Sequence, residues 1–203
     1  MKKVLYVFLA ALLVLSLVGC KSKPSNDQSN GAQTTVKFAR GSWDDSQTTF
    51  TSDFSGLTIK ISSAYSALTD AELAENYLGD TSFDFTNADY DKMTTIPECA
   101  FANYLTGVNC GVLYENVKAE GAPDISEDDY LDAAVKNIDG DKGGYYDLTI
   151  GGKQYRAMNR SVEQEGSTFF QTMAVRNIDG YMLLVVFTST EQEPIDEMIS
   201  FFE

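Results

Sequence analysis

Oxygen-bearing side chains recur after residue 86 at the spacing of a calcium-binding loop. The first, third, fifth and twelfth positions of such a loop are occupied by Asn87, Asp89, Asp91 and Glu98. The sixth position needs glycine for a sharp turn, but it is Lys92, which also brings a positive charge to the ion. The spacing therefore predicts no metal site here, and no other motif indicates a cofactor.

Histidine is absent from the sequence, which removes the commonest general base and the commonest zinc ligand. Acidic residues crowd one segment, where they are typical of a helix N-terminus rather than a reaction centre: Asp124, Glu127, Asp128, Asp129 and Asp132. We predict that the protein is not an enzyme and has no catalytic residue. A hydrolase that uses a carboxylate pair is the alternative, and its geometry is not readable from spacing.

Cys20 ends an apolar run close to the N-terminus. Lys2 and Lys3 precede the run, residues 4–18 are almost wholly apolar, and Gly19 stands before the cysteine. This order resembles a bacterial lipoprotein signal, in which a small residue permits cleavage and the next thiol takes a diacylglycerol. The run is shorter than the roughly 20 residues that span a bilayer. We expect lipidation of Cys20 and a lipid-anchored protein on the extracytoplasmic face of the cell membrane.

We expect the chain to divide into three parts: a signal peptide at 1–19, a flexible tether at 20–34 and a single globular domain at 35–203. The tether contains no apolar residue larger than alanine after Cys20, so it cannot bury enough surface to offset its chain entropy. Removal of the signal peptide leaves 13 basic against 30 acidic residues, a net charge of −17. Such a charge repels phosphate backbones, so we expect no nucleic-acid partner.

Cys99 and Cys110 form an even pair in a compartment where disulfides persist. If the turn between their strands centres between Tyr104 and Leu105, the two cysteines face each other within bridging range. A turn centred nearer Thr106 and Gly107 separates them. The sequence leaves both registers open, and a Cys99–Cys110 disulfide is one of the two outcomes.

Strand and helix signals alternate along the domain. Alternating apolar residues bounded by turn residues predict strands at 36–41, 46–51, 56–62, 97–104, 109–117, 145–150, 153–159, 168–177 and 181–189. Three helix starts share a hydroxyl residue followed three positions later by an acid: Thr69 with Glu72, Ser126 with Asp129, and Thr190 with Glu193. The first helix is predicted over 70–78, and the second is predicted to end before Gly140.

The strand at 181–189 decides the architecture. Residues 182–187 read Met-Leu-Leu-Val-Val-Phe and are apolar on both faces, which an antiparallel strand tolerates only when both sides of its sheet are covered. The three helices are the available covers. The pattern predicts an α+β fold, an α/β/α sandwich around a central, mainly antiparallel sheet.

Trp43 is expected in a turn with Asp44 and Asp45. An exposed tryptophan there is a candidate partner-contact residue, while a tryptophan folded back over the sheet would be structural. The aromatic residues on the later strands are interpreted as core, because aromatic cross-strand pairs stabilise sheets.

Short segments along the domain resemble the Mog1/PsbP-like fold of secreted lipoproteins from Gram-positive bacteria. They are Gly-Ser-Trp-Asp at 41–44, Ser-Gly-Leu-Thr-Ile-Lys at 55–60, Ala-Asn at 102–103 with Gly107, Tyr-Glu-Asn at 114–116, and the closing strand and helix from Tyr181. The resemblance implies a scaffolding or accessory protein that binds other proteins, and it implies no shared catalytic residues.

These observations favour a membrane-anchored, non-catalytic binding or accessory module whose partner is a protein or another cell-envelope component. A carboxylate-dependent hydrolase is one alternative. A solute-capturing lipoprotein is the other, although such proteins are usually longer and have two lobes.

Overall fold

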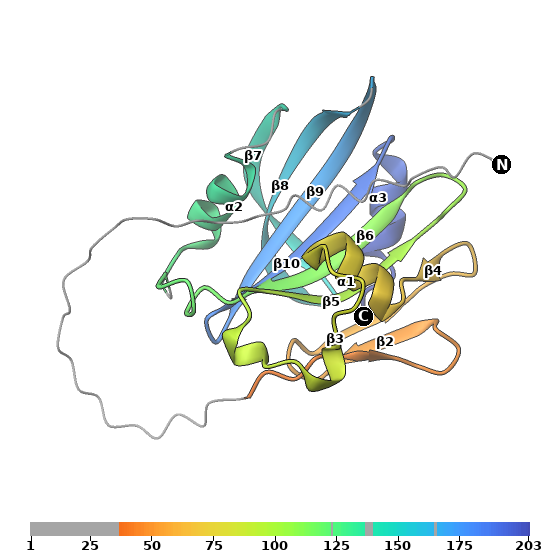
Figure 1. Cartoon of the computed structure of the whole chain (residues 1–203). Coiled ribbons are helices and arrows are strands. Elements are labelled where there is room, and N and C mark those ends of the chain that lie inside the picture. The colour runs from red at the N-terminus through yellow and green to blue at the C-terminus, as the bar shows by residue number, and fades with distance from the viewer. Residues whose placement is uncertain (1–36, 123, 137–139, 165) are drawn as a thin grey trace.

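The computed structural model describes residues 37–203, except 123, 137–139 and 165. The expected signal peptide at 1–19 and the expected tether at 20–34, which begins with Cys20, lie outside the described residues. The described part contains a seven-stranded sheet, a three-stranded sheet and three α-helices (Figure 1). None of its helices is long and apolar enough to cross a membrane.

The large sheet is antiparallel throughout. In spatial order its strands are β4 (Ser66–Ala67), β5 (Thr95–Ala102), β6 (Asn109–Glu115), β10 (Tyr181–Ser189), β9 (Ser167–Ile178), β8 (Lys153–Gln164) and β7 (Lys142–Ile150). The predicted hairpins are confirmed, since Ile150 pairs with Lys153 across Gly151 and Gly152, and Ile178 pairs with Tyr181. β8 runs five residues past its predicted end at 159.

The small sheet has the order β1 (Ser42–Trp43), β2 (Thr49–Ser52), β3 (Leu57–Lys60). The strand expected at 36–41 is wrong for the described residues 37–41, which form no strand. Trp43 belongs to β1 opposite Phe50 rather than to the turn. The turn lies one residue later because the Asp44 carboxylate accepts the backbone N–H groups of Thr48 and Thr49.

Two of the three helices follow their predicted caps. α1 (Asp70–Leu78) has the capping box of Thr69 and Glu72, and α2 (Glu127–Val135) begins after Ser126, whose hydroxyl accepts the N–H of Asp129. The predicted cap of α3 is wrong: α3 (Glu193–Ile199) begins after Gln192, with no side-chain cap. Two short 3-10 helices, η1 (Phe85–Asn87) and η2 (Tyr90–Lys92), precede β5.

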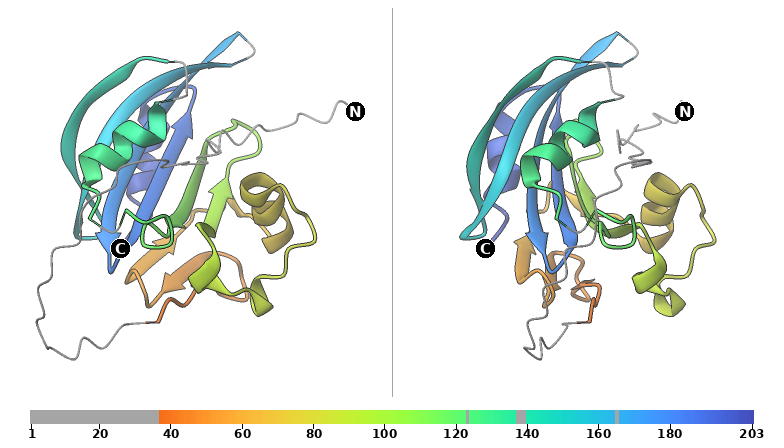
Figure 2. Two further views of the ribbon diagram at one scale, coloured as in Figure 1. Left: turned by 60° about the vertical axis from the view of Figure 1, so that its left-hand side comes forward. Right: turned by 90° about the vertical axis from the view of Figure 1, so that its left-hand side faces the viewer.

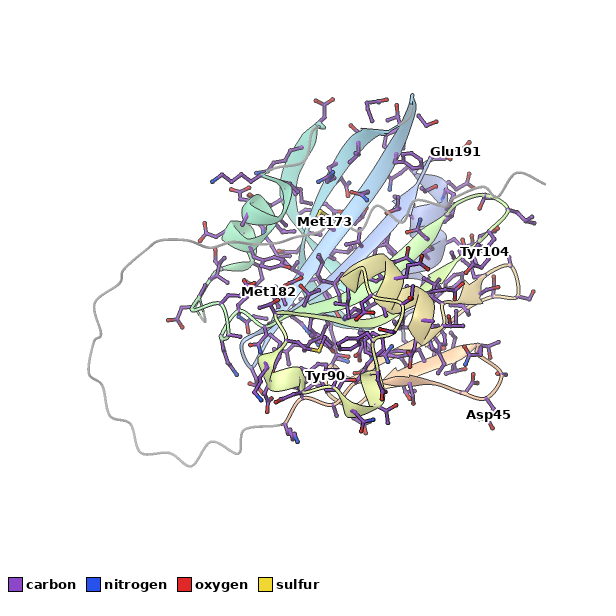
Figure 3. All side chains as sticks on the ribbon, in the orientation of Figure 1. Asp45, Tyr90, Tyr104, Met173, Met182 and Glu191 are labelled. Carbon is purple, nitrogen blue, oxygen red and sulfur yellow. The ribbon has the colours of Figure 1, made fainter. Side chains whose placement is uncertain are left out.

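Both faces of the large sheet are covered, as β10 requires. Leu183 and Val185 of β10 pack with residues of β2, β3 and α3 in one core, and Met182 and Leu184 pack with residues of α2 in another. α1 covers Ala100 and Ala102 of β5. Figure 2 shows α2 and α3 on opposite sides of the sheet, and Figure 3 marks Met173 and Met182 on its strands.

The fold is therefore an α+β sandwich, and the predicted class is confirmed. The structure adds the small sheet, which shares one face with α3. The chain end is part of this cover, because Phe202 bridges to Ile59 of β3 and Lys60 donates its N–H to the carbonyl of Phe201.

Candidate functional site

A pocket of about 400 Å³ lies between the end of α2 and the strands β7 and β8, which are neighbours in Figure 1. Its lining residues are Asp132, Ala133, Val135, Lys136, Gly140, Asp141, Lys142 and Arg160. Gly140 brings the chain against β8 so closely that a Cβ atom there would overlap the carbonyl oxygen of Ser161. The volume falls within the roughly 300–1,000 Å³ of small-molecule sites.

The acid from α2 in this pocket is already engaged. The Asp132 carboxylate contacts the Lys142 ammonium and the Tyr145 hydroxyl, and the Lys142 Nζ lies 3.0 Å from that hydroxyl. The hydrogen bond from Lys142 lowers the pKa of Asp132, with a smaller contribution from Tyr145. Asp132 is therefore ionised near neutral pH, and it cannot act as a general acid.

Arg160 is the buried charge of the pocket. Its residue is 6 % exposed, and its Nε and Nη2 atoms have no hydrogen-bond partner among the described residues. Burial lowers the pKa of this guanidinium. The β8 strand positions it between Lys142 on β7 and Gln171 on β9.

A separate arginine fixes α2 on the sheet beside the pocket. The Arg156 Nε donates to Asp128 of α2 at 2.6 Å, and its Nη1 donates to Asp147 of β7 at 3.0 Å. The acid cluster at 124–132 thus serves the helix: Ser126 caps it, and Asp128 and Asp132 hold it to β8 and β7.

Glu98 is a buried acid on β5, and it does not line the pocket. β5 has a bulge between Pro97 and Cys99, and there the Glu98 carboxylate accepts the backbone N–H of Gly41 at 3.0 Å. The Arg40 guanidinium donates to the carbonyls of Pro97 and Glu98. Burial raises the pKa of Glu98 to about 7, although Ser52, Gly41 and Arg40 favour the charged form.

Glu115 is a second buried acid, at the end of β6 under α2. The Thr95 hydroxyl is 2.9 and 3.0 Å from its two carboxylate oxygens. Burial raises the pKa of Glu115 to about 8, and the charge of Glu120 acts in the same direction. Burial raises the pKa of the Tyr130 hydroxyl, and the charges of Glu115 and Glu120 act in the same direction. This hydroxyl has no hydrogen-bond partner within the described part of the chain.

The acids with raised pKa values and the pocket are therefore in different places. Glu98, Glu115 and Glu120 are absent from the pocket lining, and its two acids are Asp132 and Asp141. No group of three or more Cys, Asp or Glu residues that could hold a metal ion occurs within the described ranges. Of the calcium-loop positions, Asp89 pairs with Lys92 at 2.6 Å and Glu98 is directed to Gly41.

Trp43 folds back onto the domain. It is half-buried, its ring centroid lies 5.4 Å from that of Phe50, and its indole nitrogen is buried. Of the two positions considered for Trp43, the structure therefore has the one in which the ring packs back onto the domain. Its role as a partner contact stays a prediction.

Cys99 and Cys110 are both buried free thiols. Cys99 lies opposite Val112 and Cys110 lies opposite Phe101, so the register in which the cysteines face each other is wrong. The turn centres one residue later than that register requires. The cysteines are diagonal neighbours, a relation in which Cα atoms are roughly 7–8 Å apart, beyond the usual range of a disulfide.

We expect no disulfide in the purified protein. The intact mass should be the same before and after reduction, and the unfolded, unreduced chain should react with iodoacetamide at Cys99 and Cys110. Burial raises the pKa of both thiols, so the folded chain should react far more slowly. A gain of two hydrogen atoms on reduction would contradict this prediction.

Sequence reasoning missed Arg160 and the buried state of Glu98, although both left a signal. Arg160 alternates with Met158 and Val162, two buried apolar residues, and Glu98 stands inside the apolar segment 96–102. A charged residue at an inward position of a strand is the pattern to look for.

Comparison with known proteins assigns neither a family nor a function to this chain. No known protein family and no curated protein matches the sequence. Among solved structures, LpqN of Mycobacterium tuberculosis, involved in cell envelope biogenesis, is 12 % identical with a TM-score of 0.39, covering 71 % of this chain and 76 % of its own. A Pseudomonas aeruginosa protein of unknown function, described as a candidate regulator, is 15 % identical with a TM-score of 0.33, covering 44 % and 67 %.

Both similarities are too low to carry an argument about the fold or the function of this chain. The resemblance to the Mog1/PsbP-like fold and to lipoproteins of Gram-positive bacteria stays a prediction from the sequence.

Proposed function

We propose that this chain is a lipid-anchored binding module on the extracytoplasmic face of a cell membrane, and that it catalyses no reaction. The anchor is Cys20, whose setting after a basic start and an apolar run is typical of a lipidated cysteine. The polar tether at 20–34 would let the domain search for its partner near the membrane.

The observation that carries the binding role is the separation of the pocket from the acids that could exchange protons. A catalytic acid needs a raised pKa and a position at the substrate. Glu98 and Glu115 have raised pKa values but line no part of the pocket, whereas Asp132 lines it and is held ionised by Lys142. This arrangement supports ligand capture and gives no support to the carboxylate-dependent hydrolase.

The partner is a protein or another cell-envelope component. A mature net charge of −17 favours approach of basic surfaces at long range and disfavours nucleic acid. A solute-capturing lipoprotein is less well supported, because the described residues build covers on both faces of one central sheet rather than two lobes around a cleft.

The anchor is tested by replacing one thiol. Cys20→Ser should abolish incorporation of radiolabelled palmitate and should leave an unprocessed precursor or release the domain from the membrane, because lipidation requires the Cys20 sulfur. Cys110→Ser is the matched control, since its thiol is buried in the sheet, and it should keep the label.

Cells producing each variant are fractionated and their membranes probed for the protein and the label. A Cys20→Ser chain that remains processed, membrane-bound and labelled would overturn the lipid anchor. Turnover of a substrate at the pocket that is lost in Asp141→Asn would overturn the non-catalytic role.

A further inference from the structure

Strand β7 is a long edge of the large sheet. It is the last strand in the sheet order and pairs only with β8, and Figure 1 shows it as the outermost strand on the side of α2. The opposite edge strand, β4, has only two residues, whereas β7 keeps an unbroken register with β8 from Tyr145 to Ile150. Exposed edges pair readily with another strand, and many proteins keep them short or interrupt them with proline. β7 contains no proline, so it is the edge of this sheet to which a strand can be added.

The hairpin at the end of β7 determines which backbone groups face the free edge. Gly151 and Gly152 have φ values of 55° and 70°, as in a two-residue type I′ turn, so Ile150 and Lys153 exchange both ladder hydrogen bonds. Because this bonding alternates along an antiparallel strand, the backbone groups that point away from β8 belong to Tyr145, Asp147 and Thr149. Outside the strand ladders, no backbone hydrogen bond between described residues involves these three. Their N–H and C=O groups are therefore available to another strand.

The side chains of β7 present different surfaces on the two faces of the sheet. Tyr146 and Leu148 are half-buried and pack with the core under α3, so an added strand would meet an apolar surface on that face. Asp147 lies on the α2 face, where it shares the Arg156 guanidinium with Asp128. One guanidinium between two carboxylates leaves a surplus of negative charge on the α2 face.

The helices on the two faces add to this negative charge. α2 contains four acidic residues and no basic one, and α3 contains three acidic residues and no basic one. The side chains of Asp128 and Asp147 are 44 % and 76 % exposed, so a partner can reach them. A basic strand is complementary in charge to this edge, whereas a second copy of the chain, with an expected mature charge of −17, is repelled.

We propose that β7 binds an extended basic segment of a partner protein, which adds to the large sheet as a further strand. Alternate residues of that segment would be basic, toward Asp147 on the α2 face, and apolar, toward Tyr146 and Leu148 on the α3 face. Main-chain hydrogen bonds to the edge give such a complex its affinity, and the alternating side chains give it specificity. The inference rests on the proposed binding function and names the chemistry of its partner.

The test is a fluorescence anisotropy titration of the full-length chain, purified in nonionic detergent, with a labelled peptide of four Lys-Val repeats. A peptide of four Glu-Val repeats is the control with the opposite charge. We expect the Lys-Val peptide to bind, more weakly as the salt concentration rises, and the Glu-Val peptide not to bind. Failure of the Lys-Val peptide to bind, or equal binding of the two peptides, would overturn the proposal.

A proline on the edge separates strand addition from attraction by charge alone. Thr149→Pro removes one outward N–H and places a ring on the free edge, while the ladder hydrogen bonds of Leu148 and Ile150 to β8 remain. It should weaken binding of the Lys-Val peptide roughly tenfold or more. Thr149→Val keeps the N–H and should bind as wild type does. Wild-type affinity in Thr149→Pro would show that the peptide does not pair with the edge.

Hydrogen exchange of the backbone amides, followed by NMR, tests the same edge without a variant. Without peptide, the amides of Tyr145, Asp147 and Thr149 should exchange rapidly, whereas those of Tyr146 and Leu148, which bond to β8, should exchange slowly. The Lys-Val peptide should slow exchange of the three outward amides roughly tenfold or more, and unchanged exchange in a peptide-bound sample would contradict strand addition.

Other occupants of the edge would also be visible in this experiment. Slow exchange of the outward amides without peptide would mean that the edge is already covered and would overturn the proposal. If that protection rises with protein concentration, the occupant is a second copy of the chain. These outcomes leave the anchor untouched, and a failed Cys20 experiment leaves the titration standing.

Discussion

The free energy of unfolding should fall by several kcal/mol as the pH rises from about 5 to about 8. This behaviour would be unusual, because most globular proteins reach their maximum stability between these two pH values. The cause is a pair of buried acids, Glu98 on the bulge of β5 and Glu115 at the end of β6. Glu98 is 0 % exposed and Glu115 is 1 % exposed. Burial raises their pKa values to about 7 and about 8, from 4.5.

The sign follows from proton binding. Between pH 4.5 and the folded pKa, the folded chain keeps the proton while the unfolded chain has lost it, so each rise in pH favours unfolding. The stabilising contribution of each acid is complete below pH 4.5 and is lost as the pH passes about 7 for Glu98 and about 8 for Glu115. Complete loss of the contribution amounts to about 3 kcal/mol for Glu98 and about 5 kcal/mol for Glu115.

Glu98→Gln isolates one of the two contributions. The amide keeps the shape and accepts the Gly41 N–H but never ionises, so the variant should match wild type near pH 5 and exceed its stability at pH 8 by about 3 kcal/mol. Glu115→Gln should behave in the same way. Glu75→Gln, at an exposed position of α1, is the control and should keep the wild-type slope.

Urea denaturation of the full-length chain at several pH values measures these differences. Parallel curves for wild type and Glu98→Gln across the whole interval would show that Glu98 titrates as an exposed acid does, and would contradict its burial in this fold.

Local signals carried most of the fold. The capping box of Thr69 with Glu72 and the stop at Gly79 fix α1 to the residue, and the glycine turns at 151–152 and 179–180 fix two hairpin registers. Those interactions join residues close in sequence, so their geometry is encoded in a few side chains. The apolar run of β10 predicted two covered faces because burial on both sides leaves no polar position.

Features that depend on distant partners were not readable. The β5–β6 register is offset by the bulge at Glu98, where Arg40 and Gly41, which are 58 and 57 positions away, bond to β5. α3 begins at Glu193 rather than after Thr190, where packing of Ile195 and Met198 on the sheet outweighs the local cap. The pocket likewise brings residues of α2 and Arg160 of β8 into one lining. No spacing in the sequence predicts that these residues lie together.

Gly41→Ala should be among the most destabilising single-methyl substitutions in the domain. A Cβ at this position would overlap the Phe50 ring and the backbone oxygen of Thr51, and would lie 2.9 Å from the Ser52 Cβ. The ring can turn away, but the Thr51 oxygen belongs to β2, which pairs with β1 and β3. Adding a methyl group against fixed backbone costs about 1–3 kcal/mol or more.

The same substitution should act on the buried acid. Gly41 donates its N–H to Glu98 at 3.0 Å, a bond that favours the charged carboxylate. Displacing it should raise the pKa of Glu98 further, so the stability of Gly41→Ala should continue to fall at pH values where the Glu98 contribution of wild type is already lost. Gly144→Ala, with no atom within 4 Å of the added Cβ, is the matched control and should stay within about 0.5 kcal/mol of wild type. If Gly41→Ala unfolds at the same urea concentration as Gly144→Ala, the close approach of residues 40–41 to β2 and β5 is wrong, and with it the explanation of the bulge that buries Glu98.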